Sequence, residues 1–373
     1  MAAERLADDL LVEILARVPA RSVCRFKCVS KDWLSLIDHP DHHRKLPQTL
    51  AGFFYARSDN RELPLETEVR FAGVSGNRCP PVDTSFAFLP SHRRVDLLDC
   101  CNGLLLCRWY GVSALGDEFC YIVCNPATKE WVSLPDRSHE NKVGIERLGF
   151  DPTMSSHFYV FVLLENVNFN AYLAEVEVYS SETKRWVYKE IGWNKRIVLP
   201  AEQPSAVFLN GCLHFYSFGS IFFHAFDHET YNCLAVVDTK GETWMPFGVP
   251  GGLVDGFVQQ SQGYLHYANF QNDGHSDVVR QVVYVLEDYD SQEWIMKHNI
   301  EEMSYIFGGI NSLLNGDFIW IAIHPECNLV FFNVGRDTTL ICYNMDRRQV
   351  VCINVCLNLV LIFSHCCMHG FKF

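Results

Sequence analysis

The first forty residues place apolar side chains with the period of an α-helix. Within residues 8–18 they recur at i, i+1, i+4, i+5 and i+8, which lines one face of a helix. Asp8 and Asp9 put negative charge where the dipole of a helix N-terminus favours it, and Pro19 ends the helix. The pattern predicts an amphipathic helix whose apolar face consists of Leu10, Leu11, Ile14, Leu15 and Val18.

Two further short helices are predicted, because Ser22 and Ser30 each stand where a serine can cap a helix N-terminus. Their apolar side chains are Val23, Phe26 and Val29 in the first helix and Trp33, Leu34 and Ile37 in the second. The last helix must end near His39 and Pro40. Roughly 32 residues of helix bury too little surface to be securely stable alone. The apolar faces therefore need a partner, and the periodicity leaves open whether that partner is the rest of the chain or another protein.

The order of residues in this helical region resembles the F-box. Its hallmarks are a Leu before an acidic helix start, Leu-Leu-x-Glu-Ile-Leu, an Arg-Val-Pro break, and a Ser-opened helix followed by Arg-x-x-x-Val-Ser-Lys-x-Trp. They are carried here by Leu6, Leu10, Leu11, Glu13, Ile14, Leu15, Arg17, Val18, Pro19, Ser22, Arg25, Val29, Ser30, Lys31 and Trp33. The chain departs from the family at Ala7, where the usual Pro would preorganise the first helical turn. We expect this change to weaken the box modestly.

The resemblance implies a small all-α F-box domain over residues 1–45 that docks on a Skp-family adaptor and, through it, on a cullin scaffold. It assigns adaptor binding to Leu6, Leu10, Leu11, Ile14, Leu15, Val18, Pro19, Val29 and Trp33. A helical cap on the downstream domain is the alternative. A cap has no reason to carry the whole F-box order, so the resemblance favours an adaptor-binding box.

From about residue 50 the pattern changes to short runs of Phe, Val, Ile, Leu and Tyr between Asn, Gly, Asp and Pro, which is typical of strands and turns. A first repeated marker is a turn pair before an apolar strand, at residues 102–105, 210–213, 262–265 and 315–318. A second is a polar turn that ends in Trp, as in CNPATKEW and YSSETKRW. The second marker supplies Trp131, Trp186, Trp244 and Trp294, and Val350 takes the Trp place in YNMDRRQV.

Successive marker tryptophans are roughly 50 to 58 residues apart, a period that fits a β-propeller blade, as in kelch arrays. We expect Asn-Gly to form tight hairpins and each Trp to be buried between neighbouring blades. Five repeats are visible, over residues 95–135, 145–192, 205–248, 255–298 and 313–353. Residues 50–90 and 354–373 would complete one more blade and so remove the exposed strand edges. A β-sandwich with coincidental Trp spacing is the alternative.

The β region also resembles the F-box-associated domain of the large plant F-box families. CNGLLLCRW and YIVCNPATKEWVSLP match the opening signature of that domain. The final NLVLIFSHCCMHGFKF departs from the family's usual ending, which puts closure of the last blade in doubt. The predicted fold is thus a small all-α F-box followed, over residues 46–373, by an all-β domain that forms a propeller.

Composition narrows the function classes. The chain is 49% apolar and 20% charged, which allows a large core, and its net charge of -13 argues against nucleic acid as a general partner. The short basic clusters at residues 92–94 and 347–348 are interpreted as solvated turns.

The 16 cysteines include no CxxC pair, and the N-terminus lacks an apolar signal core. We therefore expect a soluble protein of a reducing compartment, cytoplasm or nucleus, with free thiols. The apolar stretch over residues 350–363 is too short to span a membrane and is expected to be a buried strand.

A search for catalytic motifs finds no GxSxG, P-loop, GxGxxG or HExxH. His39, His42 and His43 lack a nearby fourth ligand and are interpreted as a polar linker rather than a metal site. His214 and His266 hold matching places in two repeats, where they either line a channel or are ordinary core or surface histidines, and the second interpretation is favoured. The sequence therefore predicts no catalytic residue, no cofactor, no metal and no membrane partner.

Two function classes follow from the sequence. The first is a substrate-recognition subunit of a Skp-cullin-F-box (SCF) ubiquitin ligase, whose β domain binds a protein target for ubiquitination and degradation. The second is a propeller enzyme or carbohydrate-binding module with a helical N-terminal cap. The F-box residue order favours the first class. The target is not identified by the sequence, because propeller recognition depends on variable loops.

Overall fold

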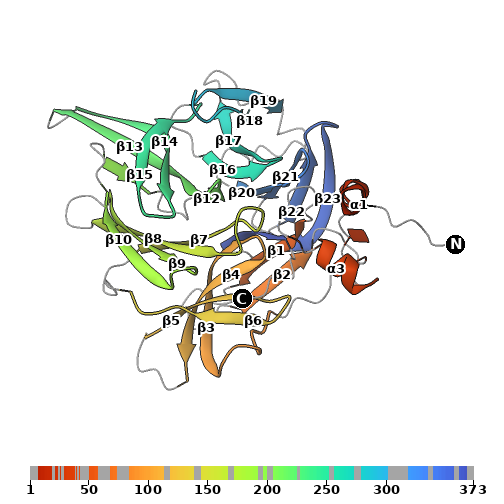
Figure 1. Ribbon diagram of the computed structural model, residues 1–373. Coiled ribbons are helices and arrows are strands. Elements are labelled where there is room, and N and C mark those ends of the chain that lie inside the picture. Colours follow the sequence, from red (N-terminus) through yellow and green to blue (C-terminus); the bar gives the residue numbers. More distant parts are fainter. Residues whose placement is uncertain are drawn as a thin grey trace.

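The computed structural model describes most of the chain and is shown in Figure 1. The described residues are 7–18, 22–23, 26, 29–37, 39, 42, 50–57, 68–73, 84–112, 118–137, 144–166, 172–191, 196–199, 205–224, 227–251, 256–272, 279–300, 318–334, 339–356 and 361–367. They comprise a short helical region followed by an all-β domain.

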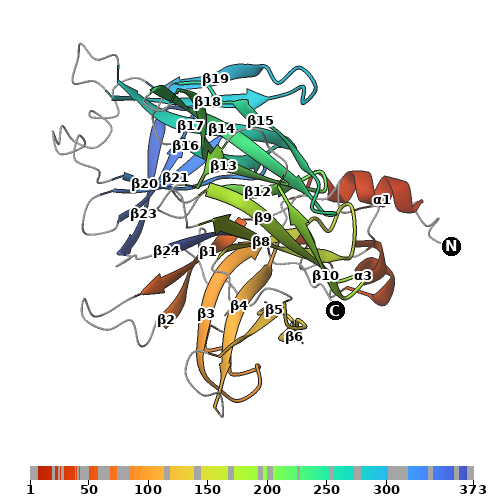
Figure 2. The ribbon, with the colours of Figure 1, turned by 90° about the vertical axis from the view of Figure 1, so that its left-hand side faces the viewer.

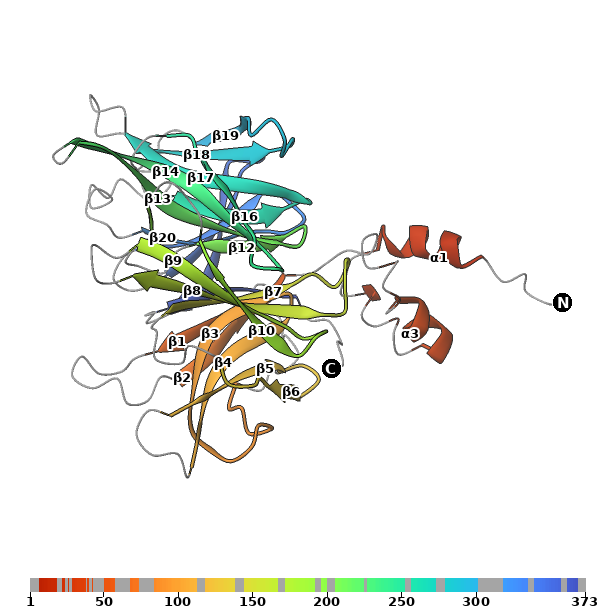
Figure 3. The ribbon, with the colours of Figure 1, turned by 60° about the vertical axis from the view of Figure 1, so that its left-hand side comes forward.

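Two helices of the N-terminal region fall where the periodicity predicts them. Helix α1 spans Asp8–Leu15, with both acidic residues in its first turn, and the chain leaves the helix through a turn at residues 16–18. Helix α3 spans Lys31–Ile37. The hydroxyl Oγ of Ser30 accepts a hydrogen bond from the backbone N–H of Trp33 at 3.1 Å, which is the predicted N-cap. In Figures 2 and 3 both helices lie to one side of the β domain.

The β domain contains six antiparallel sheets among the described residues. The first three are β2-β1-β24 (Glu68–Gly73, Leu50–Arg57, Leu361–Cys367), β3-β4-β5-β6 (His92–Cys101, Leu104–Gly111, Cys120–Asn125, Glu130–Ser133) and β7-β8-β9-β10 (Gly144–Phe150, Phe158–Asn166, Tyr172–Ser180, Arg185–Glu190). In the fourth, β11 and β12 (Arg196–Val198, Ala206–Leu209) both pair with β13, followed by β14 and β15 (Cys212–His224, Asp227–Asp238, Thr243–Gly248). The last two are β16-β17-β18-β19 (Gly256–Ser261, Tyr264–Asn272, Val279–Leu286, Trp294–Ile300) and β20-β21-β22-β23 (Phe318–Ile323, Leu329–Val334, Thr339–Asn344, Gln349–Cys356).

The six sheets form a closed ring, which confirms the predicted propeller and makes the sandwich alternative wrong. The innermost strands β3, β7, β12, β16, β20 and β24 each contact the next one, and β24 contacts β3 again. Figure 1 shows the sheets arranged as blades around this ring. Closure joins the two ends of the domain, because β1 pairs with β24 and places Leu50 opposite Cys367. The divergent C-terminal sequence therefore still supplies a closing strand, and the ring has no open side.

The first repeated marker forms the expected hairpin turns. Asn102, Asn210 and Gln262 have φ of 46°, 52° and 53°, and the glycine after each is also in the left-handed region. Two successive residues with positive φ are the signature of the turn that matches the twist of a two-residue hairpin. Nothing lies within 4 Å of a Cβ built on Gly211, so its backbone angle rather than crowding favours glycine there. The fourth copy, at residues 315–316, lies outside the described residues.

The second marker forms a turn that an Asn or Asp near its start stabilises. Oδ1 of Asp238 accepts hydrogen bonds from the backbone N–H groups of Lys240 and Glu242, both at 2.8 Å. Oδ1 of Asn125 does the same for Ala127 at 3.0 Å. Short Asn and Asp side chains favour turns because they supply such local acceptors. This explains why polar residues recur in front of each marker Trp.

The marker tryptophans differ in their surroundings. The indole N–H of Trp186 donates to the carbonyl oxygen of Pro135 at 2.8 Å, and that of Trp294 donates to Gly248 at 3.2 Å, so each reaches the preceding blade. Both rings are half-buried. Trp131 is 39% exposed, so the predicted burial is wrong there. It lies on the outer strand β6, and the neighbouring sheet β2-β1-β24 has only three described strands to face it. The side chain of Trp244 lies outside the described part.

The core of the β domain is divided into apolar layers between neighbouring blades. The layer between β3–β6 and β7–β10 is typical, and its fully buried members include Leu104, Leu106, Val123, Phe150 and Val160. The predicted strand over residues 350–363 forms the end of β23 and the start of β24. Val351 in it is 50% exposed, which contradicts the expectation that the stretch is buried. No helix in the described residues is long and apolar enough to cross a membrane.

Candidate functional site

The apolar residues of the helical region divide into an inner and an outer set. The inner set is buried in a small core of its own, made of Val12, Leu15, Val23, Leu36 and Ile37. The outer set is exposed: Leu10 by 54%, Ile14 by 51%, Val29 by 62% and Leu34 by 42%. Leu10 and Ile14 stand one turn apart on α1, so they share one face of that helix. The outer set is not part of the core that the described residues form, so its side chains are accessible at the surface.

Three further residues of the predicted adaptor face lie between the two sets. Leu11, Val18 and Trp33 are half-buried and pack against the small core. The Trp33 ring meets that of Phe26 edge to face, with centroids 5.3 Å apart. Leu15, also assigned to the face, is 1% exposed and belongs to the core. Leu6 and Pro19 lie outside the described residues, and adaptor binding by the whole set stays a prediction.

Leu34 was assigned to a helix but not to the adaptor face. Its exposure sets it apart from Leu36 and Ile37 on the same helix, which are buried. Leu34 lies about 200° around the helix from Leu36 but only about 60° from Ile37. The spacing therefore gives no signal that separates Leu34 from the two buried residues.

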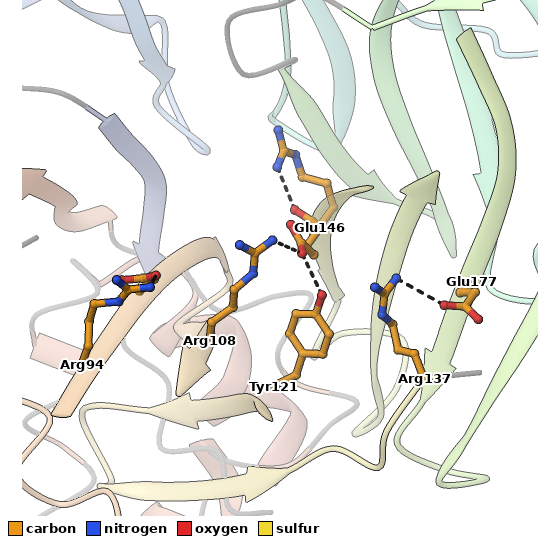
Figure 4. Close-up of polar contacts among 8 residues, drawn as sticks. Arg94, Arg108, Tyr121, Arg137, Glu146 and Glu177 are labelled. Carbon is orange, nitrogen blue, oxygen red and sulfur yellow. Dashed lines mark hydrogen bonds and ion pairs between the residues drawn. The ribbon is translucent and has the colours of Figure 1, made fainter. Parts of the chain in front are cut away.

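A polar seam joins the β3–β6 blade to the β7–β10 blade, and Figure 4 shows its contacts. Nη2 of Arg108 lies 2.5 Å from Oε1 of Glu146, and the hydroxyl of Tyr121 donates to the same oxygen at 2.7 Å. Nη1 of Arg137 lies 3.3 Å from Oε2 of Glu177, whose side chain is fully buried. The blades are thus held together by charged hydrogen bonds as well as by apolar packing.

Burial sets the electrostatics of this seam. The pKa of Tyr121 lies well above its usual value, because burial and the nearby Glu146 carboxylate both oppose ionisation. The hydroxyl therefore remains protonated and continues to donate to Glu146. Burying charges is costly, so removing one partner of Arg137 and Glu177 would leave the other charge uncompensated. The geometry fixes the junction of the two blades.

At one end the seam reaches the surface through arginines stacked on aromatic rings. The guanidinium of Arg94 lies 4.0 Å from the centre of the Tyr110 ring, and Arg108 lies 4.9 Å from that of Phe119. Arg94 also pairs with Asp96 at 3.1 Å. The interpretation of residues 92–94 as a solvated turn is wrong, because they begin strand β3. The pair Arg347-Arg348 does lie in a turn.

Two buried histidines are enclosed in the core. Nε2 of His214 lies 2.7 Å from the Tyr289 hydroxyl of the next blade, and His266 lies 3.4 Å from Nζ of Lys297. Both are 1% exposed. Burial lowers the pKa of each to about 4, so both are neutral at physiological pH. Of the channel, core and surface positions predicted for these residues, the enclosed core position is the one observed.

No group of three metal-ligating side chains occurs in the part of the chain that the structure describes. His39 and His42 have ring centroids 4.9 Å apart, and a ring nitrogen of His42 lies 2.7 Å from the carbonyl oxygen of Leu36. His43 lies outside the described residues. The contact with Leu36 attaches the linker to the end of α3.

Comparison with known proteins identifies both regions. A family model described as "F-box domain" matches residues 4–45, and one described as "F-box protein At3g26010-like, beta-propeller" matches residues 83–367. "F-box protein At5g07610" of Arabidopsis thaliana is 30% identical over 318 residues, which covers 79% of this chain and 70% of that protein. "F-box protein At1g30790" of the same plant is 24% identical over 356 residues, covering 87% of this chain and 83% of that protein.

Among solved structures, the chain is similar to an α-L-arabinanase of Penicillium chrysogenum complexed with arabinobiose. The identity is 11%, the similarity covers 75% of this chain and 84% of that one, and the TM-score is 0.39. A likeness at that score carries no argument about function. The match to the propeller family spans most of the chain, and the F-box match covers the helical region that precedes it. The chain belongs to the F-box proteins with an At3g26010-like β-propeller.

Proposed function

We propose that this chain is the substrate-recognition subunit of an SCF ubiquitin ligase. Residues 1–45 form the F-box domain and dock on a Skp-family adaptor, which links the chain to a cullin scaffold. Residues 46–373 form the domain that binds a protein target. The target is then ubiquitinated by other subunits and degraded, and this chain supplies no catalytic residue. The compartment is the cytoplasm or the nucleus, where free thiols such as those of the described cysteines persist.

The observation that carries this proposal is the outer apolar set of the F-box domain. Leu10, Ile14, Val29 and Leu34 are exposed although the domain has a core of its own. Exposed apolar side chains on so small a domain mark a protein-binding surface rather than an unfinished core. A few such residues typically dominate the binding energy of an interface.

The arrangement of the two domains supports a tethering role. The F-box domain lies to one side of the propeller in Figures 2 and 3, so it can bind an adaptor without covering the blades. A target held on the propeller would be kept close to the ubiquitin carrier that the scaffold brings. Such tethering raises the effective concentration of the target's lysines and turns a bimolecular step into a nearly unimolecular one.

Adaptor binding is tested by charge substitutions in the outer set. Ile14→Asp and Leu34→Asp should each weaken binding of a purified Skp-family adaptor about 30-fold or more, the usual loss at a hot spot. Ser35→Asp is the matched control, because it adds the same charge at an exposed neighbouring position on α3. Its affinity should stay close to that of the wild type. Unchanged affinity in Ile14→Asp and Leu34→Asp, or an equal loss in Ser35→Asp, would contradict the proposal.

The receptor role is tested in cells with the doubly substituted Ile14→Asp/Leu34→Asp chain. It should still bind its target, because the substitutions lie outside the propeller. It should no longer connect the target to the ligase, so the half-life of co-purified partners should lengthen relative to the Ser35→Asp control. A partner whose half-life is unchanged, or turnover of a small molecule by the purified chain, would favour a different function.

A further inference from the structure

The turn between β18 and β19 is more acidic than the matching turns of the other blades. Residues 287–294 contain Glu287, Asp288, Asp290 and Glu293 and no Lys or Arg. The other described copies of this turn mix acidic and basic residues and have net charges between -1 and +1, at residues 124–131, 179–186, 237–244 and 343–350. The turn itself needs only one of its carboxylates, because Oδ1 of Asp288 accepts a hydrogen bond from the backbone N–H of Asp290 at 3.0 Å. The geometry of the turn therefore does not explain the other three.

The charge of this turn is not neutralised by the residues that the structure describes. All four carboxylates belong to exposed residues, and none of them forms an ion pair with a described residue. Lys297 on β19 instead has its Nζ 3.4 Å from Nε2 of His266. When Lys297 is counted together with this turn and the turns of both adjoining blades, there are eight carboxylates and four Lys or Arg side chains, at residues 237–244, 287–294, 297, 324–328 and 343–350. The excess of negative charge therefore remains when the neighbours are included.

Exposed apolar side chains lie beside the acidic turn, on one face of the sheet. Tyr264 is 47% exposed and Ile295 is 50% exposed, whereas Leu104, which matches Tyr264 in the β3–β6 blade, is completely buried. His266, Val285 and Ile295 pair in one row across β17, β18 and β19. Tyr264 lies two residues before His266, so its side chain and that of Ile295 are on the same face. The strands β17 and β19 are two strand spacings apart, about 10 Å, which leaves room for one apolar side chain between Tyr264 and Ile295.

An occupant of this surface must complement both the charge and the apolar side chains. Unpaired carboxylates attract Lys and Arg side chains, and they repel the phosphates of a nucleic acid. No group of three metal-ligating side chains occurs in the described part of the chain, so these carboxylates are not arranged as a metal site. The exposed apolar side chains favour an apolar group on the same partner. A protein segment with basic residues around an apolar one fits both features.

We propose that this surface binds the target protein, through a segment that carries Lys or Arg on both sides of an apolar side chain. This proposal rests on the receptor function proposed above. We call the surface the acidic patch, and it consists of Tyr264, Glu287, Asp288, Asp290, Glu293 and Ile295. The apolar side chain of the target packs between Tyr264 and Ile295, and its basic side chains bind to the carboxylates of the turn. The acidic patch shares no residue with the outer set of the F-box domain, which is assigned to the adaptor.

The experiment selects binders from a random 12-residue peptide display library on the full-length chain in complex with a Skp-family adaptor. The enriched peptides should carry Lys or Arg on both sides of an apolar residue. The affinity of one enriched peptide is then measured by fluorescence polarisation. Asp290→Lys should weaken it about tenfold or more, and Ile295→Ser should weaken it about fivefold or more. Both positions are exposed, so the two variants keep the fold.

Matched controls come from the same turn in the β7–β10 blade. Glu182 holds the place of Asp290, four residues before the marker Trp, and Val187 holds the place of Ile295, directly after it. Both control side chains are exposed. Glu182→Lys and Val187→Ser should bind the peptide as the wild type does. A scrambled peptide of the same composition should bind more weakly, because it keeps the charge but loses the spacing.

Three results would overturn the proposal. The first is that no basic peptide is enriched. The second is that Glu182→Lys and Val187→Ser lose as much affinity as Asp290→Lys and Ile295→Ser. The third is that the scrambled peptide binds as tightly as the original, which would mean that the net charge of -13 attracts any basic peptide.

The two proposals fail separately. The adaptor affinity of Asp290→Lys should equal that of the wild type, because Asp290 does not belong to the F-box domain. Loss of peptide binding in that variant with full adaptor binding supports the acidic patch. Full peptide binding in Asp290→Lys, with adaptor binding still lost in Ile14→Asp, overturns the acidic patch and leaves the receptor function standing.

Discussion

Apolar side chains are placed differently in the two regions of this molecule. In the F-box domain Leu10, Ile14, Val29 and Leu34 are between 42% and 62% exposed, beside a small core in which five of the described residues are buried. In the layer between the β3–β6 and β7–β10 blades, residues such as Leu104 and Phe150 are completely buried. The apolar side chains of this layer are buried within the chain, whereas the F-box domain leaves part of its described apolar surface exposed, which the proposed function assigns to adaptor binding. Substitutions in the two regions should therefore separate stability from binding.

The largest effect is expected in the propeller layer. Phe150→Ala removes a fully buried ring and should lower the free energy of unfolding of the β domain by about 4 kcal/mol, because it leaves a cavity between two blades. Denaturant unfolding followed by tryptophan fluorescence measures the loss. Met154→Ala, in the turn that follows and 52% exposed, is the control and should change stability by less than about 0.5 kcal/mol. Equal effects in the two variants would contradict the layered core.

A somewhat smaller effect is expected at the buried ion pair of the polar seam. Arg137→Met leaves the Glu177 carboxylate in the interior and should destabilise the β domain by about 3 kcal/mol. The double variant Arg137→Met/Glu177→Met should recover most of that loss, because no charge is then left uncompensated. If the double variant is no more stable than Arg137→Met, the two side chains stabilise the β domain by more than the neutralisation of each other's charge.

Acid should destabilise the propeller through its buried histidines. The pKa of His214 is lowered to about 4 in the folded chain, below the ordinary value of 6.5. Between these values the unfolded chain binds more protons, so stability falls as the pH drops from about 6.5 to about 4. The loss should be of the order of 2–3 kcal/mol for this residue. Unfolding measured across that range in wild type and His214→Gln should show a shallower slope in the variant, and parallel slopes would rule out His214 as a source.

The sequence predicted the features that depend on neighbouring residues. Ser30 caps α3, and Asn102 and Asn210 adopt the left-handed backbone of a hairpin turn, because each outcome is decided within a few residues of the chain. The period of the markers also predicted the blades, since the same local pattern recurs. Closure through β1 and β24 was inferred from what the other repeats left over, and the pairing of Leu50 with Cys367 confirms it.

The sequence did not predict the features that depend on contacts between neighbouring blades. Trp131 carries the same marker as Trp186, but the exposure of its ring depends on the neighbouring sheet, which has three described strands there. Arg108 and Glu146 stand 38 positions apart, and no local pattern brings them together. The division of the F-box residues into inner and outer sets likewise depends on how α1 packs against α3. The apolar periodicity of so short a helix does not decide which of its sides faces the core. That depends on packing against residues far away in the sequence.

The smallest effect on stability is expected in the outer set of the F-box domain. It gives the clearest test of whether these exposed side chains serve binding rather than stability. Leu10→Ser removes a side chain that is 54% exposed and should change the free energy of unfolding by less than about 0.5 kcal/mol. Leu15→Ala, five residues later on the same helix and 1% exposed, should destabilise the domain by about 2–3 kcal/mol.

Hydrogen exchange of the α1 amides in the full chain measures the stability of both variants. Adaptor affinity should fall in both variants, but excess adaptor should restore protection of α1 in Leu15→Ala, because binding offsets a loss of folding. In Leu10→Ser the protection of α1 should match the wild type before any adaptor is added. If Leu10→Ser itself unfolds α1, the exposed set belongs to the core of the domain, and the contrast between the two regions does not hold.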